Sequence, residues 1–176
     1  MVQTAVNADF DQAYEGKVHV SGAYPTTYIS RLAAATVYFG KAVVANSQTN
    51  LVLGEQEVKL PAAAGDVPLL LGVSAADVTK SPSSTGYAAY DADESVTVMR
   101  KGLIWVVSAD AITNLGTNGV WVRHANGAAV QTASLGSFRA TTNADYTEWS
   151  ATQDVKWIAY KLIGSVHYGL LEINLP

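Results

Sequence analysis

The chain has 176 residues, a formal net charge of −4 and 15% charged residues, where about a quarter is usual. Its 49% hydrophobic share excludes a wholly disordered protein, and the absence of cysteine excludes disulfides, zinc–thiolate sites and cysteine nucleophiles. The sparse, mildly acidic charge argues against nucleic acid as a partner, since binding it needs a basic patch that neutralises phosphates.

The first 36 residues differ from the rest in composition. They contain three tyrosines, at positions 14, 24 and 28, and glycines and a proline interrupt any regular period. This pattern predicts an extended N-terminal arm over residues 1–36, held by aromatic anchors. Tyrosine and arginine dominate interface energetics, so the arm is a candidate partner-binding segment. An ordinary first strand with a loop packed on the same domain is the open alternative.

The N-terminus has neither the basic nor the apolar region of a signal peptide.

Beyond residue 36 the hydrophobic period is mostly two rather than 3.6, and β-branched and aromatic runs recur, which is typical of half-buried strands. The turn signals between these runs predict a mainly β domain. Lys101-Gly102 is expected to form a tight turn between two strands, and Asn126-Gly127 a hairpin turn. Gly164-Ser165 is expected to close a final hairpin. The expected strands are 96–98, 104–107, 120–122, 157–163 and 166–173.

Helices are expected to be few and short. Residues 109–115 could form one helical turn, capped by Ser108 or Asp110 and ended by Gly116. A second short turn is expected within 145–151. No stretch approaches the roughly 18 apolar residues of a membrane span, so no membrane partner is expected.

The search for catalytic chemistry finds little. The three histidines lack the spacing of metal ligands, and no nucleophile elbow or phosphate-binding loop occurs. Trp149, between Glu148 and Ser150, is the best candidate for an exposed aromatic residue. The other tryptophans lie in apolar runs and are expected in the core. We therefore expect a non-enzymatic binding or structural protein with no catalytic residue, cofactor or metal.

Several segments, taken in order, resemble the structural cement (head decoration) proteins of tailed bacteriophages. The resemblance covers most of residues 13–175. The segments are AYEGKV at 13–18, FGKAVV at 39–44, VKLP at 58–61 and VTVMRKGLIWV at 96–106.

The resemblance implies a single β-barrel or β-tulip-like domain over residues 37–176, with the arm over residues 1–36. It implies a protein made in the host cytoplasm and carried on the outer surface of the capsid. The partners would be the major capsid protein and neighbouring copies of the chain in a homodimer or homotrimer. The protein would bridge neighbouring capsid subunits and stabilise the expanded shell. The residues expected to hold or bend the arm on its partner are Tyr14, Gly16, Gly22, Tyr24, Pro25, Tyr28 and Arg31.

Two other functions stay open on the sequence alone. The tryptophan and tyrosine content would suit a carbohydrate- or receptor-binding β-module of a phage tail or extracellular appendage. Glu148, Asp154 and a histidine could serve a small β-fold hydrolase, although any chain with 15 acidic residues offers such pairs.

Overall fold

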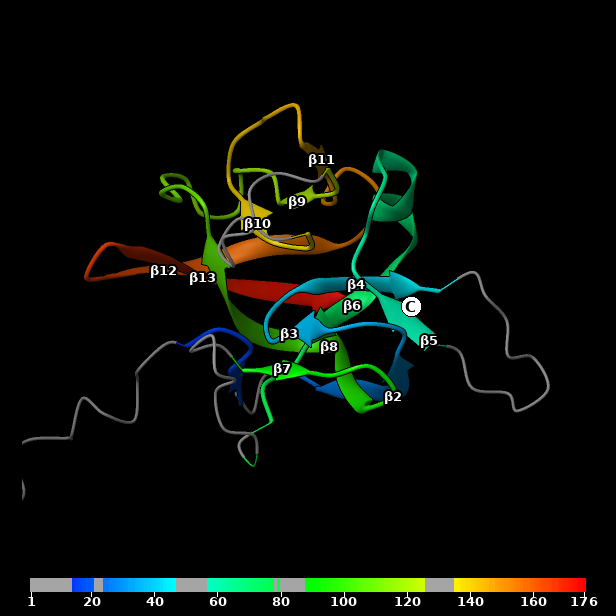
Figure 1. The fold of residues 1–176 in the computed structure, drawn as a ribbon. Helices are drawn as coiled ribbons and strands as arrows, with labels where there is room; N and C mark the ends of the chain where they lie inside the picture. The colour runs from blue at the N-terminus through cyan, green and yellow to red at the C-terminus, as the bar shows by residue number, and fades with distance from the viewer. Residues whose placement is uncertain (1–13, 21–23, 47–56, 78, 80–87, 126–134) are drawn as a thin grey trace, which may run out of the picture.

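The computed structural model describes residues 14–20, 24–46, 57–77, 79, 88–125 and 135–176 (Figure 1). Nearly all regular structure in these residues is β, which confirms the mainly β fold class. None of the described helical residues forms a helix long and apolar enough to cross a membrane. The strands are β1 (Val18–His19), β2 (Thr27–Ala33), β3 (Val37–Tyr38), β4 (Ala42–Ala45), β5 (Glu57–Lys59), β6 (Leu70–Ser74), β7 (Ala89–Tyr90), β8 (Ser95–Ser108), β9 (Trp121–Arg123), β10 (Phe138–Arg139), β11 (Tyr146–Glu148), β12 (Val155–Ile163) and β13 (Val166–Asn174).

The long strand β8 organises an eleven-stranded sheet (Figure 1). On one edge it pairs with β1 and then β2, so that Ile104 faces Val18 and Lys101 faces Thr27. On the other edge it pairs with β13 and then β6. Because both edges are hydrogen-bonded, β8 is a rigid central element to which the first described segments of the chain are attached.

The prediction of a tight turn at Lys101-Gly102 is wrong, because β8 runs through both residues without a break. Gly102 faces Ile173 of β13, and Lys101 faces Thr27 on one side and Asn174 on the other. Long-range pairing on both edges therefore overrides the local turn signal. Gly102 has φ +123°, and an added Cβ would lie 3.2 Å from the Thr26 hydroxyl oxygen.

The strand pairings form a closed path. From β8 the path passes through β2, β5, β4 and β6 and returns to β8. A separate pair, β3 and β7, adds Val37 and Tyr90 to the hydrophobic cluster that the strands of this path share. The buried members of this cluster are Ala33, Val37, Phe39, Val43, Val58, Tyr90, Val96 and Val98.

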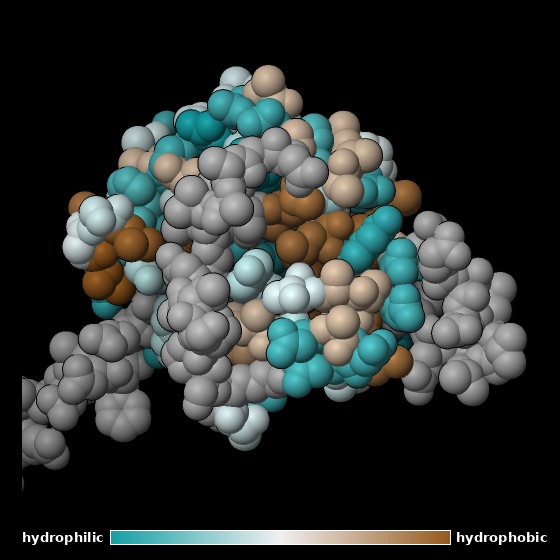
Figure 2. Space-filling view, viewed as in Figure 1, coloured by the Kyte–Doolittle hydropathy of each residue, from teal (hydrophilic) through white to brown (hydrophobic). Residues whose placement is uncertain are grey.

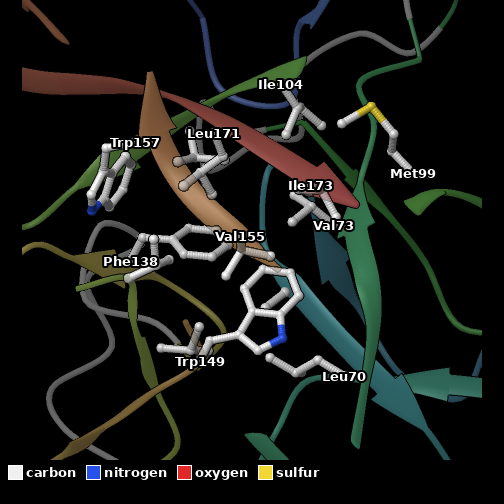
Figure 3. Packing of buried hydrophobic residues seen from close by; sticks show 14 of the residues in the cluster. Leu70, Val73, Met99, Ile104, Phe138, Trp149, Val155, Trp157, Leu171 and Ile173 are labelled. Carbon is white, nitrogen blue, oxygen red and sulfur yellow. The ribbon is translucent and has the colours of Figure 1, made fainter. Parts of the chain in front are cut away.

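A larger core cluster lies where β9, β10, β12 and β13 pack against the rest of the sheet (Figure 3). The ring of Phe138 lies 6.3 Å from that of Trp149 and 6.5 Å from that of Trp157, between centroids. Both tryptophans are fully buried. The prediction that Trp149 is exposed is therefore wrong. Trp157 is in the core as expected, whereas Trp105 of β8 and Trp121 of β9, expected there too, are only half-buried. The Trp149 indole nitrogen donates to Gln153 Oε1 at 2.9 Å, so its one polar atom is satisfied.

The helical turn predicted over 109–115 is absent from this described segment. Asp110 does not cap a helix there, since its carboxylate accepts the backbone N–H of Ala140 at 2.8 Å and bonds to Arg139 and Thr141. A 3-10 helix, η2 (Ala64–Leu69), occurs instead before β6. The N–H groups of Ala62 and Ala63 both donate to Asp66, which closes its start.

The final hairpin is confirmed as β12 and β13, which pair antiparallel over their length. The register shifts between Trp157 and Ala159, so Ile158 forms an irregularity in β12. The predicted Asn126-Gly127 turn lies outside the described residues.

Candidate functional site

The described part of the predicted arm lies along one edge of β8. Gly16 donates its N–H to the carbonyl oxygen of Trp105 at 2.8 Å, and β1 and β2 continue along the strand from there. Arg31 faces Val96 near the other end. The candidate contact residues are therefore spread along the edge of β8, with Tyr14 and Gly16 at one end and Arg31 at the other.

Gly16 is buried where the chain approaches the domain closely. Its φ is +80°, and an added Cβ would lie 2.9 Å from the Ala76 nitrogen and 3.0 Å from the Gly40 nitrogen. Its carbonyl oxygen accepts the N–H of Ala76 at 2.8 Å. Glycine is thus required for a fixed, tightly packed junction at this position.

A buried ion pair, which the sequence reasoning missed, reinforces this junction. The Lys41 ammonium group contacts Glu15 Oε1, and the side chain of Lys41 is 0% exposed while that of Glu15 is 18% exposed. Burial raises the pKa of Glu15, and the charge and hydrogen bond of Lys41 act in the opposite direction. A lysine within the apolar run 39–44 was the one signal that could have indicated a buried partner.

Tyr24 and Pro25 border a shallow hollow with a volume of about 180 Å³. The other lining residues come from β8 and from the end of β13: Lys101, Gly102, Glu172, Ile173 and Asn174. Beside it, Lys156 forms an ion pair of 3.2 Å with Glu172. The hollow is thus apolar at the arm residues and Ile173, with charged groups at its border.

Further exposed hydrophobic side chains come from the chain just after β1 and from β2, the two strands that pair with this part of β8. Val20, which follows β1, is 85% exposed, and Tyr28, which faces Met99 of β8, is 44% exposed. Tyr24 is 36% exposed. Tyr24 and Pro25 line the hollow together with Lys101 and Gly102 of β8, and Tyr28 pairs with Met99 of the same strand. We call Val20, Tyr24, Pro25 and Tyr28 the β1–β2 patch.

The remaining candidates do not join this patch. Tyr14 is exposed near Gly16, where its ring centroid lies 5.5 Å from the Lys17 ammonium nitrogen. Arg31 is half-buried in β2 and donates from Nη1 to the Ser30 carbonyl at 2.9 Å. Gly22 lies outside the described residues. The structure therefore brings Tyr24 and Pro25 together at one hollow, with Tyr28 nearby on β2, and it places Tyr14, Gly16 and Arg31 at other points along β8.

The described residues contain no group of three or more histidines and carboxylates placed to hold a metal ion. The two carboxylates considered for a hydrolase both have local partners. Glu148 accepts from the Ser150 hydroxyl at 2.9 Å, and Asp154 accepts from the Asn174 amide at 2.8 Å. Their arrangement is that of groups that hold turns and strand ends.

Comparison with known proteins decides the family. The family model described as structural cement protein (E217 gp24/Pam3 gp6) matches residues 2–162. The chain belongs to this structural cement protein family. A solved chain from "The capsid of Myoviridae Phage XM1" has a similar fold, with a TM-score of 0.64 at 15% identity. The alignment covers 99% of this chain and 97% of that chain. No curated protein matches the sequence.

Family membership gives this cement protein a structural role in the capsid of a bacteriophage, and so a place in the virion. The resemblance found in the sequence is thereby confirmed.

Proposed function

We propose that this cement protein binds the outer surface of a bacteriophage head, bridges neighbouring major capsid subunits and stabilises the expanded shell without catalysing a reaction. The contact surface is the β1–β2 patch. Tyr14 and Arg31, at the two ends of the same β8 edge, extend the contact.

The observation that carries this proposal is the position of the patch. Tyr24 and Pro25 line a hollow beside Lys101 and Gly102 of β8, and Tyr28 pairs with Met99 of that strand. Because β8 is hydrogen-bonded on both edges, it gives these exposed side chains a fixed support before a partner arrives. Preorganised aromatic side chains lose little conformational entropy on binding, and tyrosine is a common interface hot spot. The hollow beside Tyr24 offers a place for one side chain of the partner.

The domain behind the patch is proposed to be a small β-barrel. The closed path from β8 through β2, β5, β4 and β6 supports this, because a closed sheet leaves no edge among those strands. We propose that residues 1–36 act as one functional unit. β2, which lies within this range, is also a strand of the sheet.

The stabilising effect would come from repetition. One stable protein–protein contact typically buries about 1,600 Å². Copies that bridge neighbouring subunits over the whole shell add their modest affinities by multivalency, and they oppose the outward pressure of the packaged genome.

Point variants test the patch better than removal of residues 1–36, because that deletion would also remove β1 and β2 from the sheet. Tyr24→Ser and Tyr28→Ser are compared with Leu115→Ser, which changes an exposed hydrophobic residue outside the patch. We expect each tyrosine variant to bind expanded heads of its phage about tenfold more weakly in co-sedimentation. Wild-type affinity in both tyrosine variants, with circular dichroism unchanged, would contradict the proposal.

A further inference from the structure

Lys101 is the cation that lines the hollow beside Tyr24 and Pro25. It lies in the middle of β8, where it faces Thr27 of β2 on one side and Asn174 of β13 on the other. Because β8 is paired on both edges at this position, the backbone that carries Lys101 is fixed. The residue as a whole is half-buried.

The carboxylates near this hollow already have partners. Glu172, which also lines it, forms the 3.2 Å ion pair with Lys156. Asp154 accepts from the Asn174 amide at 2.8 Å. The hydrogen bond and charge of Glu172, followed by the charge of Asp154, raise the pKa of Lys156, so this lysine serves both acids. Within the described part of the chain, no aspartate or glutamate forms an ion pair with Lys101.

A partner that docks here would remove water from Lys101. Tyr24 and Pro25 are exposed, so a surface that covers them also covers the hollow that they share with Lys101. A cation that loses its water without gaining an anion destabilises a complex, whereas a hydrogen-bonded ion pair compensates for the lost water. The hollow therefore favours a partner that brings one negative charge to this point. Its volume of about 180 Å³ leaves room for a single side chain.

We propose that a major capsid subunit inserts an aspartate or glutamate side chain into this hollow, where the carboxylate pairs with Lys101 and the aliphatic part lies against Tyr24 and Pro25. The pairing rests on the proposed head binding and names the chemistry that the β1–β2 patch recognises. A single carboxylate suits the hollow better than a chain of phosphates, because Glu172 and Asp154 would repel a larger negative charge.

Substitutions of Lys101 test this pairing through the affinity for expanded heads, measured by co-sedimentation. Lys101→Gln should weaken binding about tenfold, since the inserted carboxylate loses its cation. Lys101→Glu should weaken it about a hundredfold, because two carboxylates then face one another. Lys101→Arg keeps the positive charge and should stay within about threefold of the wild-type affinity. Circular dichroism and thermal unfolding show that each variant is folded, and Lys101→Gln carries the test if Lys101→Glu is not.

Lys161→Glu is the matched control, since it makes the same change of charge outside the patch. Lys161 faces Tyr168 of β13, and Tyr168 faces Val107, which lies six residues, or roughly 20 Å, along β8 from Lys101. Lys161 belongs to the outer part of the β12–β13 hairpin, which projects beyond the other strands (Figure 1). Hydrophobic residues gather at this end of the molecule (Figure 2), and among them Leu162 is 54% exposed. Lys161→Glu should bind heads as the wild type does.

The carboxylate on the head can be removed separately. Carbodiimide and glycinamide convert exposed carboxylates of the heads to neutral amides. Wild-type protein should bind the treated heads about tenfold more weakly, whereas the affinity of Lys101→Gln should change little, because its ion pair is already absent.

Wild-type affinity in Lys101→Gln and Lys101→Glu would overturn the pairing, and so would equal weakening in Lys161→Glu. Tyr24→Ser in the same assay separates the two possible failures. If Tyr24→Ser still binds weakly, the patch is the contact and the carboxylate assignment alone is wrong. If Tyr24→Ser also binds as the wild type does, the patch itself is wrong.

Discussion

The Lys41 ammonium group forms a buried ion pair with Glu15, joining the predicted arm to the residue just before β4. Beside this pair, Gly16 and Gly40 approach so closely that an added Cβ on Gly40 would lie 2.7 Å from the Gly16 nitrogen. The Ser74 hydroxyl accepts the Lys41 N–H at 3.0 Å and donates to the Tyr38 carbonyl at 2.7 Å. The point at which the chain enters the domain is therefore fixed by charge, packing and hydrogen bonds together.

Replacing one residue of the Glu15–Lys41 ion pair is predicted to destabilise the protein more than replacing both. Lys41→Met leaves the Glu15 carboxylate without its cation and should lower the free energy of unfolding by about 3 kcal/mol at pH 7. The double variant Glu15→Gln/Lys41→Met should lose much less, because no charge stays buried. The cost of Lys41→Met should shrink when the pH is lowered from 7 to about 5, since burial raises the pKa of Glu15 and a lower pH favours its neutral carboxyl. Urea denaturation at both pH values measures this, and additive single-variant costs at pH 7 would contradict it.

Two variants distinguish the cost of the close contact at Gly40 from the cost of its positive φ angle. Gly40 has φ +67°, and Gly116 has φ +78° with nothing within 4 Å of an added Cβ. Gly116→Ala should therefore cost only the conformational penalty, about 1 kcal/mol. Gly40→Ala should cost several kcal/mol, because its Cβ would lie 2.3 Å from Glu15 Cγ. Equal losses in thermal or urea unfolding would show that the junction yields easily.

Asp110 is predicted to stabilise the fold in a pH-dependent manner. Burial raises its pKa, but hydrogen bonds from Thr141, Ala140 and Arg139 outweigh burial, and the pKa lies below the ordinary 3.8. Because the pKa of Asp110 is lower in the native state than in the unfolded state, the unfolded chain binds the proton more readily. The stabilisation from the Asp110 carboxylate is therefore present above about pH 4 and is lost as the pH falls through the native pKa. Asp110→Asn should cost about 1–2 kcal/mol at pH 7 and less near pH 3. Parallel stability curves for the two proteins over this range would refute the assignment.

The core position of Trp149 has its own test. Trp149→Ala should lower the free energy of unfolding by about 3–5 kcal/mol, as expected for a fully buried indole. The part of the native fluorescence that disappears in Trp149→Phe comes from Trp149. Acrylamide should quench this part only weakly in the native protein. A loss of unfolding free energy below about 1 kcal/mol, or strong quenching, would indicate an exposed ring. Either result would reopen the alternative of a carbohydrate-binding module.

The β character and the final hairpin could be predicted because period-two patterning is local to each strand. The continuity of β8 could not, since Lys101-Gly102 is a turn signal that only pairing with residues far away in the chain, such as Ile173, overrides. Trp149 was misplaced for a similar reason. Its polar neighbours are local, whereas the Phe138 ring that buries it comes from another strand.

The motifs that carried the family resemblance turn out to build the scaffold. AYEGKV and FGKAVV meet at the Glu15–Lys41 junction, and VTVMRKGLIWV is most of β8. The residues of the β1–β2 patch mostly lie between these motifs, in a segment with no regular pattern. Sequence reasoning could therefore find the family and name Tyr24, Pro25 and Tyr28 as candidates. It could not show that Tyr24 and Pro25 border a hollow beside Lys101 and Gly102, because only the fold brings these residues together.

Imaging of decorated heads tests the central claim most directly. Purified cement protein is mixed with emptied, expanded heads of its phage, and the particles are reconstructed by electron cryomicroscopy. We predict ordered density at stoichiometric sites on the outer surface, with the β1–β2 patch against the seam between major capsid subunits. Heads that carry no ordered added density, or density that contacts a single subunit through another face, would contradict the account.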